Sequence, residues 1–252
     1  NKNNYLLHNL VGTTYLQLND YDRAISHLEN SIKLKPDFAD NYNNIGIALS
    51  EKKKFEKAIS CYEKAIEIKQ NYFDAYLNMG IAFKNLKKFN NAIKSLEICI
   101  QINPNNARAY LNLGNIFVIL KKYEEAKNFF DKAIKLNKNY CEAYSNRAEL
   151  LHLHLKNIDL AIIDYERALK CNNKLKYVLG KLIHAKMHIN NWKDYDEQII
   201  KLKKGIENGE KIILPFPLLS LIDEPKLQFI TSQQYSNEIS FFSKKSIQNK
   251  TI

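Results

Sequence analysis

The sequence predicts an all-α protein, a solenoid of helix–turn–helix pairs, from two kinds of observation. First, four of its seven glycines are spaced 34 residues apart, and alanines and aromatic residues keep the same interval. These residues are Gly12, Gly46, Gly80 and Gly114; Ala24, Ala58, Ala92 and Ala126; and Tyr21, Phe55, Phe89 and Tyr123. Second, the apolar residues of each period recur at helical spacing in two runs, with a polar break between them. The scarcity of glycine and proline also argues against loop-rich β architectures.

Each period is predicted to be one repeat of two antiparallel helices. The first four repeats start at Tyr5, Ala39, Phe73 and Ala107, which puts each periodic glycine at position eight and each alanine at position twenty. Small residues at these two positions let the paired helices approach closely, and the aromatic residues fill the space beside them. Polar breaks such as residues 51–54 and 120–122 separate the two helices.

The pattern weakens toward the C-terminus. A fifth repeat starts at Cys141 and carries one additional residue before its second helix, at Ile158. A sixth pair keeps Gly180 and is expected to have its second helix begin at Trp192. We therefore predict a solenoid over residues 1–174, a degenerate capping pair over 175–210, and a final region over 211–252. That region is expected to be a proline-stiffened loop at 211–225, followed by a short helix at 225–240.

This pattern, with Pro36 and Pro104 ending two repeats, resembles the tetratricopeptide repeat. The resemblance implies a right-handed superhelix whose first helices line a concave groove that binds a protein or an extended peptide. It also implies that position six points into the groove, and an amide carries both donors and an acceptor for a peptide backbone. The candidate peptide-binding residues are Asn44, Asn78, Asn112 and Asn146 at position six and Asn115 at position nine. The alternative is that asparagine is simply common at this position of the repeat.

The net charge of +11 is carried mostly by lysine, since only four of the 38 basic residues are arginine. Proteins that read nucleic acids usually draw on arginine, so the composition argues against such a partner and fits an AT-rich genome. Lysine pairs recur at the turns, at residues 53–54, 87–88 and 121–122. They either attract an acidic partner or only keep the surface soluble.

No catalytic or metal site is predicted, and no cofactor is expected on this chain. His184 and His188 are four residues apart and could share a helix face, but no HExxH motif or third ligand accompanies them. His152 and His154 are two apart and point to different sides of a helix. A carboxylate clamp is disfavoured because position two of the third repeat is Asp74 and position six is Asn78, not basic residues.

The chain is expected to be cytoplasmic, because it shows no signal peptide and no run of about 18–20 apolar residues for a membrane helix. The four cysteines have no paired spacing, which predicts free thiols in a reducing compartment rather than a disulfide framework. The missing initiator methionine suggests a piece of a longer protein.

Residues 177–240 are similar to the junction after the repeats in O-linked N-acetylglucosamine transferases of the SPINDLY type. The similarity rests on the order of the following residues: Leu182 to His184, Lys186, Met187, Trp192, Tyr195, Gly209, Pro215, Phe216, Leu218, Leu219, Leu221, Asp223, Pro225, Leu227 and Gln228. It implies a parent glycosyltransferase that uses UDP-N-acetylglucosamine, with catalytic lobes beyond this chain. The alternative is a free-standing adaptor for assembling protein complexes.

The final region carries an apolar cluster, Phe216, Leu218, Leu219 and Leu221, that is expected to be exposed without such a neighbouring lobe. We therefore expect the isolated chain to form a homodimer or to have a mobile C-terminus.

Overall fold

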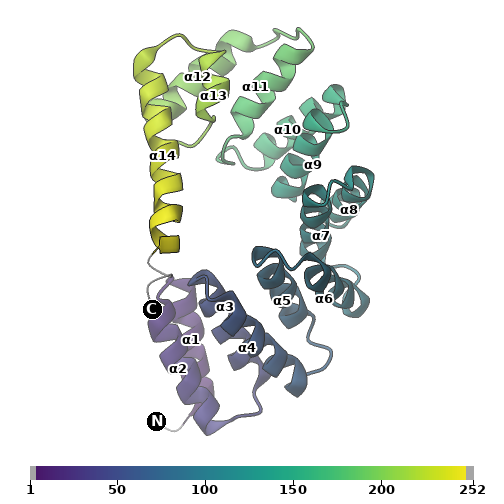
Figure 1. Ribbon diagram of the computed structural model, residues 1–252, viewed down its shortest axis with the longest axis vertical. Helices are drawn as coiled ribbons and strands as arrows, with labels where there is room; N and C mark the ends of the chain where they lie inside the picture. Colours follow the sequence, from purple (N-terminus) through teal and green to yellow (C-terminus); the bar gives the residue numbers. More distant parts are fainter. Residues whose placement is uncertain (1–3, 248–252) are drawn as a thin grey trace. The chain divides into compact units, whose positions relative to one another are not determined.

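The computed structural model describes residues 4–247, and every regular element in this range is a helix (Figure 1). The chain divides into an N-terminal part, Asn1–Leu136, and a C-terminal part, Asn137–Ile252. The N-terminal part contains α1 (Tyr5–Gln17), α2 (Tyr21–Leu34), α3 (Ala39–Glu51), α4 (Phe55–Ile68), α5 (Phe73–Asn85), α6 (Phe89–Ile102), α7 (Ala107–Ile119) and α8 (Tyr123–Leu136). The C-terminal part contains α9 (Cys141–Leu153), α10 (Ile158–Cys171), α11 (Val178–His188), α12 (Tyr195–Glu207), α13 (Pro215–Leu219) and α14 (Pro225–Ile247).

The N-terminal part is a stack of four helix pairs. Each odd-numbered helix packs on the even-numbered helix that follows it, and α2, α4 and α6 also pack on the first helix of the next repeat. Helices α1, α3, α5 and α7 contact one another in series and form one layer. These helices and α9 begin at the residues where the sequence places the repeat starts. The all-helical solenoid class predicted from the sequence is therefore confirmed.

The turn within each repeat depends on one residue with a left-handed backbone. Lys53, Lys87 and Lys121 have φ values of 60°, 59° and 59°. The residue after each one donates its backbone N–H to a carbonyl five positions earlier, as in the 2.8 Å bond from Lys54 N to Leu49 O. This hydrogen bond closes the C-terminus of the first helix. The periodic lysines therefore mark the tight turns of the solenoid.

The periodic glycines lie where the two helices of a repeat come closest. A Cβ added to Gly46 would lie 2.4 Å from Cε1 of Tyr62, whose side chain is almost fully buried. At Gly80 the nearest atom would be Cγ of Leu96, at 2.7 Å. Real Cβ atoms do not approach neighbours this closely, so any larger residue at position eight must displace the side chain that it faces.

Replacing Gly46 with alanine is expected to lower the free energy of unfolding by up to about 2 kcal/mol. Overpacking costs about 1–3 kcal/mol, and the better helix propensity of alanine returns about 1 kcal/mol at most. Gly80→Ala is the matched control, because Leu96 can change rotamer whereas the Tyr62 ring is rigid and its hydroxyl is hydrogen-bonded to Ser50. Urea denaturation checks both variants, and an equal effect at the two sites would contradict this explanation.

A buried polar network joins the first two repeats. Asn41, which has no exposed surface, donates from Nδ2 to Oγ of Ser31 at 2.8 Å and accepts from Nδ2 of Asn9 at 2.8 Å. Ser31 in turn donates to the carbonyl of Tyr5 at 2.7 Å. Because the buried polar groups have partners, the network fixes the register of α1, α2 and α3 without leaving an unpaired group.

The sixth pair is not a regular repeat hairpin. Gly180 faces Ile213 instead of a second helix, and a Cβ added there would lie 2.5 Å from Cγ1 of Ile213. The segment 211–213 also accepts backbone hydrogen bonds from the start of α11, from Tyr177 N to Lys211 O at 2.7 Å and from Gly180 N to Ile212 O at 3.1 Å. This segment thus occupies the place that the second helix takes in the earlier repeats. Helix α12 begins at Tyr195, three residues later than expected at Trp192.

The last region is more ordered than its prolines suggested. Pro215 and Pro225 begin α13 and α14, a position where the missing proline N–H costs nothing. Helix α14 continues past residue 240, the predicted end, to Ile247. The residues described therefore contain two helices where we expected a loop and one short helix.

The expectation that Leu218 belongs to an exposed apolar patch is wrong. Its side chain has no exposed surface and packs with Ile183, Leu202 and Ile206, whereas Phe216 remains 84% exposed. Leu219 is also exposed, and Leu221 packs partly against the same core. The segment is thus seated on α11 and α12, which removes one reason for expecting a missing neighbour.

The expectation of four free cysteines is also wrong. Cys141 and Cys171 form a disulfide with a Cα–Cα distance of 5.6 Å, while Cys61 and Cys99 are free. Antiparallel pairing places the first residue of α9 beside the last residue of α10, so cysteines 30 positions apart meet without any CxxC spacing. Cysteine spacing therefore gives no argument for a reducing compartment.

Candidate functional site

The layer of first helices in the N-terminal part carries four of the five predicted asparagines, and we call it the first-helix face. Consecutive helices on this face are linked by side-chain amides. Asn44 donates from Nδ2 to Oγ1 of Thr13 in the preceding repeat at 3.4 Å, and Asn78 donates to Oδ1 of Asn43 at 3.1 Å. Asn44 and Asn78 are half-buried, and neither Oδ1 accepts a hydrogen bond from any described residue. Each of these amides therefore keeps an acceptor for a ligand.

The other predicted amides differ from this pair. Asn112 is only 7% exposed, donates to the carbonyl of Arg108 at 2.9 Å and accepts from Nζ of Lys84 at 2.8 Å. Asn115 is half-buried on the same helix. Asn146 is half-buried on α9 and so belongs to the C-terminal part. The sequence pattern gave the five amides the same expected role. The side chain of Asn112, however, already donates one hydrogen bond and accepts another within the protein.

Two cations, Lys84 and Arg108, lie near Asn112 on the first-helix face. Burial, followed by the charge of Arg108, lowers the pKa of Lys84. Within residues 4–247, no carboxylate lies at ion-pair distance from Lys84 or Arg108. Burial also raises the pKa of Asp74 on the same face, while Lys69 and Arg108 act against this shift. The face therefore offers unpaired positive charge beside amide acceptors, which suits an acidic or carbonyl-rich ligand.

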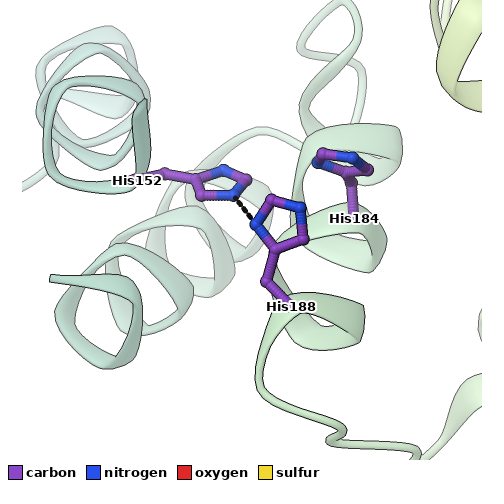
Figure 2. A group of neighbouring side chains, drawn as sticks. All are labelled: His152, His184 and His188. Atoms are coloured by element: carbon purple, nitrogen blue, oxygen red, sulfur yellow. Dashed lines mark hydrogen bonds between the residues drawn. The ribbon is translucent and has the colours of Figure 1, made fainter. Parts of the chain in front are cut away.

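A second candidate site is a group of three histidines in the C-terminal part (Figure 2). Nε2 of His152 lies 3.1 Å from Nδ1 of His188, and the rings of His184 and His188 are 4.4 Å apart between centroids. A third histidine thus lies beside His184 and His188, where the sequence indicated none. His152 is 32 residues away from His184 in sequence, but α9 and α11 are in contact.

A pocket of about 170 Å³ adjoins this group. It is lined by His152 and His184 together with Glu149, Tyr165, Tyr177 and Pro217, among others. The hydroxyl of Tyr165 is buried and has no hydrogen-bond partner among the described residues, and burial raises its pKa. Burial and the two neighbouring histidines lower the pKa of His152 to about 4, and burial also lowers that of His184.

Sequence reasoning also missed a buried ion pair in the fifth repeat. Arg147 donates from Nε to Oδ2 of Asp164 at 2.7 Å and from a terminal nitrogen to Oδ1 at 2.8 Å. Position seven is apolar in the three preceding repeats, with Ile45, Met79 and Leu113. A single arginine at this otherwise apolar position was the signal that could have revealed the pair.

Comparisons with known proteins agree with this architecture. A family model described as a TPR repeat matches residues 12–53 and 48–87, and one described as a tetratricopeptide repeat matches 73–106 and 107–140. These matches run over just more than half of the chain. A search of curated proteins finds no significant match.

Solved structures show the same fold at low identity. PilF of Pseudomonas aeruginosa is 21% identical with a TM-score of 0.72, over 79% of this chain and 90% of that protein. Cut9 bound to Hcn1, from the APC/C, is 18% identical with a TM-score of 0.70, over 92% of this chain and 43% of that one. YrrB, described as a TPR protein with an unusual peptide-binding site, is 17% identical with a TM-score of 0.54, over 75% and 93%. From the matched repeats and this shared architecture, the chain belongs to the tetratricopeptide repeat family.

Proposed function

We propose that this chain is a protein-binding module that holds an extended, acidic peptide segment on the first-helix face of its N-terminal part. The observation that carries the proposal is the pair of cations, Lys84 and Arg108, that have no carboxylate partner in the described residues and lie beside amide groups. The Oδ1 atoms of Asn44 and Asn78 supply acceptors for the peptide N–H groups. Acidic side chains of the peptide would meet the two cations.

The predicted asparagines of this face are expected to act unequally. Asn78 makes one side-chain hydrogen bond within the protein, through Nδ2, and its Oδ1 atom is available to accept one from a ligand. Asn112 instead holds Lys84 in place, and so acts on a ligand through that amine. Asn115 is part of the same proposal as a flanking amide on α7, whereas Asn146 lies in the C-terminal part and stays a separate prediction. Binding through the peptide backbone would tolerate many peptide sequences, provided that acidic residues meet the cations.

Selection from a random peptide library on the full chain tests this proposal. We expect the selected peptides to be enriched in aspartate and glutamate. Asn78→Ala with Asn112→Ala should weaken their binding without unfolding the solenoid, and Lys84→Met with Arg108→Gln should weaken it at least about tenfold, because charge-assisted hydrogen bonds are lost. Binding should also weaken as NaCl is raised.

The matched control is Lys87→Gln with Lys121→Gln, which removes two charges from the turns and none from the first-helix face. This variant should bind the selected peptides as the wild type does, as measured by calorimetric titration. An equal loss in the control would mean that only net charge matters, and unchanged affinity in both variants would place the peptide elsewhere.

A narrower candidate is the substrate-binding arm of a SPINDLY-like O-linked N-acetylglucosamine transferase that uses UDP-N-acetylglucosamine. It rests on the residue order of 177–240 alone, and the family models that match end at residue 140. An adaptor for complex assembly fits the same face equally well. The reading frame after Ile252 separates them, since a sugar-nucleotide-binding region there supports the transferase and a stop codon supports the adaptor.

A further inference from the structure

We propose that His152, His184 and His188 bind one divalent transition-metal ion of the zinc class. One nitrogen from each ring can be chosen so that all three atoms lie within 4.8 Å of one another. Ligand nitrogens in a tetrahedral zinc site are about 3.3 Å apart, as follows from Zn–N bonds of about 2.0–2.1 Å. His152 and His188 already match this spacing at 3.1 Å. To complete the set, the His184 ring would move so that its nitrogen closes from within 4.8 Å to this spacing.

The helices hold the three rings on one side of a shared space. His184 and His188 are four residues apart on α11, so both side chains project from the same helix face. His152 projects toward them from α9, as Figure 2 shows, and its ring also makes an edge contact with Tyr165. His152 is only 3% exposed, whereas His188 is exposed. The buried ring therefore provides a fixed ligand, and the exposed ring provides the route by which an ion enters.

The chemistry of the group suits a transition metal. A metal binds the imidazole nitrogen, and one ring nitrogen from each of the three histidines lies within 4.8 Å of the others. Imidazole nitrogen suits zinc, copper and nickel, whereas magnesium and calcium prefer oxygen ligands. With three protein ligands a zinc ion keeps a fourth position. The pocket lined by His152, His184 and Tyr165 has room for a water or small ligand there.

The N-terminal part contains a natural comparison. Nδ1 of His8 lies 3.3 Å from Nδ1 of His27, with ring centroids 5.6 Å apart. This spacing is close to that of His152 and His188, yet no third ligand of the described chain completes a set around it. The pair is therefore a hydrogen-bonded contact within a single repeat. It serves as the control for metal binding, because it has two histidines instead of three.

Calorimetric titration of the full, metal-free chain with Zn²⁺, and with Co²⁺ as a spectroscopic probe, tests the proposal. We expect one equivalent of each ion to bind, and Co²⁺ to give the visible absorption of a low-coordinate nitrogen site without thiolate charge-transfer bands. His152→Ala, His184→Ala and His188→Ala should each weaken binding by at least about tenfold, since each removes one of three ligands. Zn²⁺ should also raise the melting temperature, and EDTA should reverse this effect.

Two controls keep the outcome decisive. His8→Ala with His27→Ala, and separately His154→Ala, should leave the stoichiometry and affinity unchanged. His188 is exposed, so His188→Ala tests the site even if His152→Ala fails to fold. The proposal is overturned if Zn²⁺ does not bind, if His188→Ala binds it as the wild type does, or if the His8 and His27 variant loses it.

Discussion

Replacing Arg147 with alanine is expected to lower the free energy of unfolding of the C-terminal part by about 3–5 kcal/mol. The variant would leave the carboxylate of Asp164 buried without its partner. The side chain of Asp164 is only 3% exposed, and both of its oxygens accept hydrogen bonds from Arg147. Removing one partner of a buried ion pair leaves an uncompensated charge away from water, and this costs about 3–5 kcal/mol. Urea denaturation followed by circular dichroism measures the loss.

A double variant separates the charge effect from packing. The equivalent positions of the third repeat are Met79 and Ser95, so Arg147→Met with Asp164→Ser gives the fifth repeat the pair that the same fold already carries there. This variant should recover most of the stability lost in Arg147→Ala, since no charge is then buried. A double variant as unstable as the single one would mean that Arg147 acts through its packing on Tyr144 and its other neighbours.

The repeats themselves could be predicted almost residue by residue. Gly46 and Tyr62 are 16 positions apart and lie on paired helices, so the information that places them is contained in one 34-residue period. Local rules also explain the turns, because one left-handed residue at Lys53 and its equivalents ends each first helix. Contacts of this kind recur in the chain, and recurrence is what sequence periodicity detects.

The features that the sequence missed are those that occur once. The disulfide, the Arg147–Asp164 pair and the three histidines each join residues from different helices of the C-terminal part, with no equivalent in the other repeats. Segment 211–213 likewise replaces a helix at Gly180, although Gly180 itself keeps the periodic position. Periodicity predicts which residues recur from one repeat to the next. It does not predict which residues a segment contacts once its sequence departs from the repeat.

The first-helix face also has features that periodicity predicts and features that it does not. The sequence placed Asn44, Asn78 and Asn112 on the first-helix face at one repeat position, but it could not show that the amides already bond to neighbouring helices. Nor could it show that Lys84 points its amine at Asn112, because that contact crosses between repeats and has no periodic equivalent. The location of the face was therefore predictable, and its chemistry was not.

Removing the disulfide between Cys141 and Cys171 is expected to cost about 3–4 kcal/mol in the free energy of unfolding of the C-terminal part. The two cysteines are separated by 30 residues and connect the start of α9 to the end of α10. Closing a loop of this length in the unfolded chain removes entropy worth about 3–4 kcal/mol. Cys141→Ser with Cys171→Ser, compared with the wild type by urea denaturation, gives the size of the effect.

A reductant distinguishes this effect from a loss of packing. Dithiothreitol should lower the urea midpoint of the wild-type protein toward that of the double serine variant, and it should leave the midpoint of the variant itself unchanged. Cys61→Ser is the control, because Cys61 is a free thiol of the N-terminal part, and this variant should keep the full response to dithiothreitol. A wild-type midpoint that does not respond, in protein shown by mass to be oxidised before treatment and reduced after it, would mean that the helix pair is held by its packing and not by the covalent link.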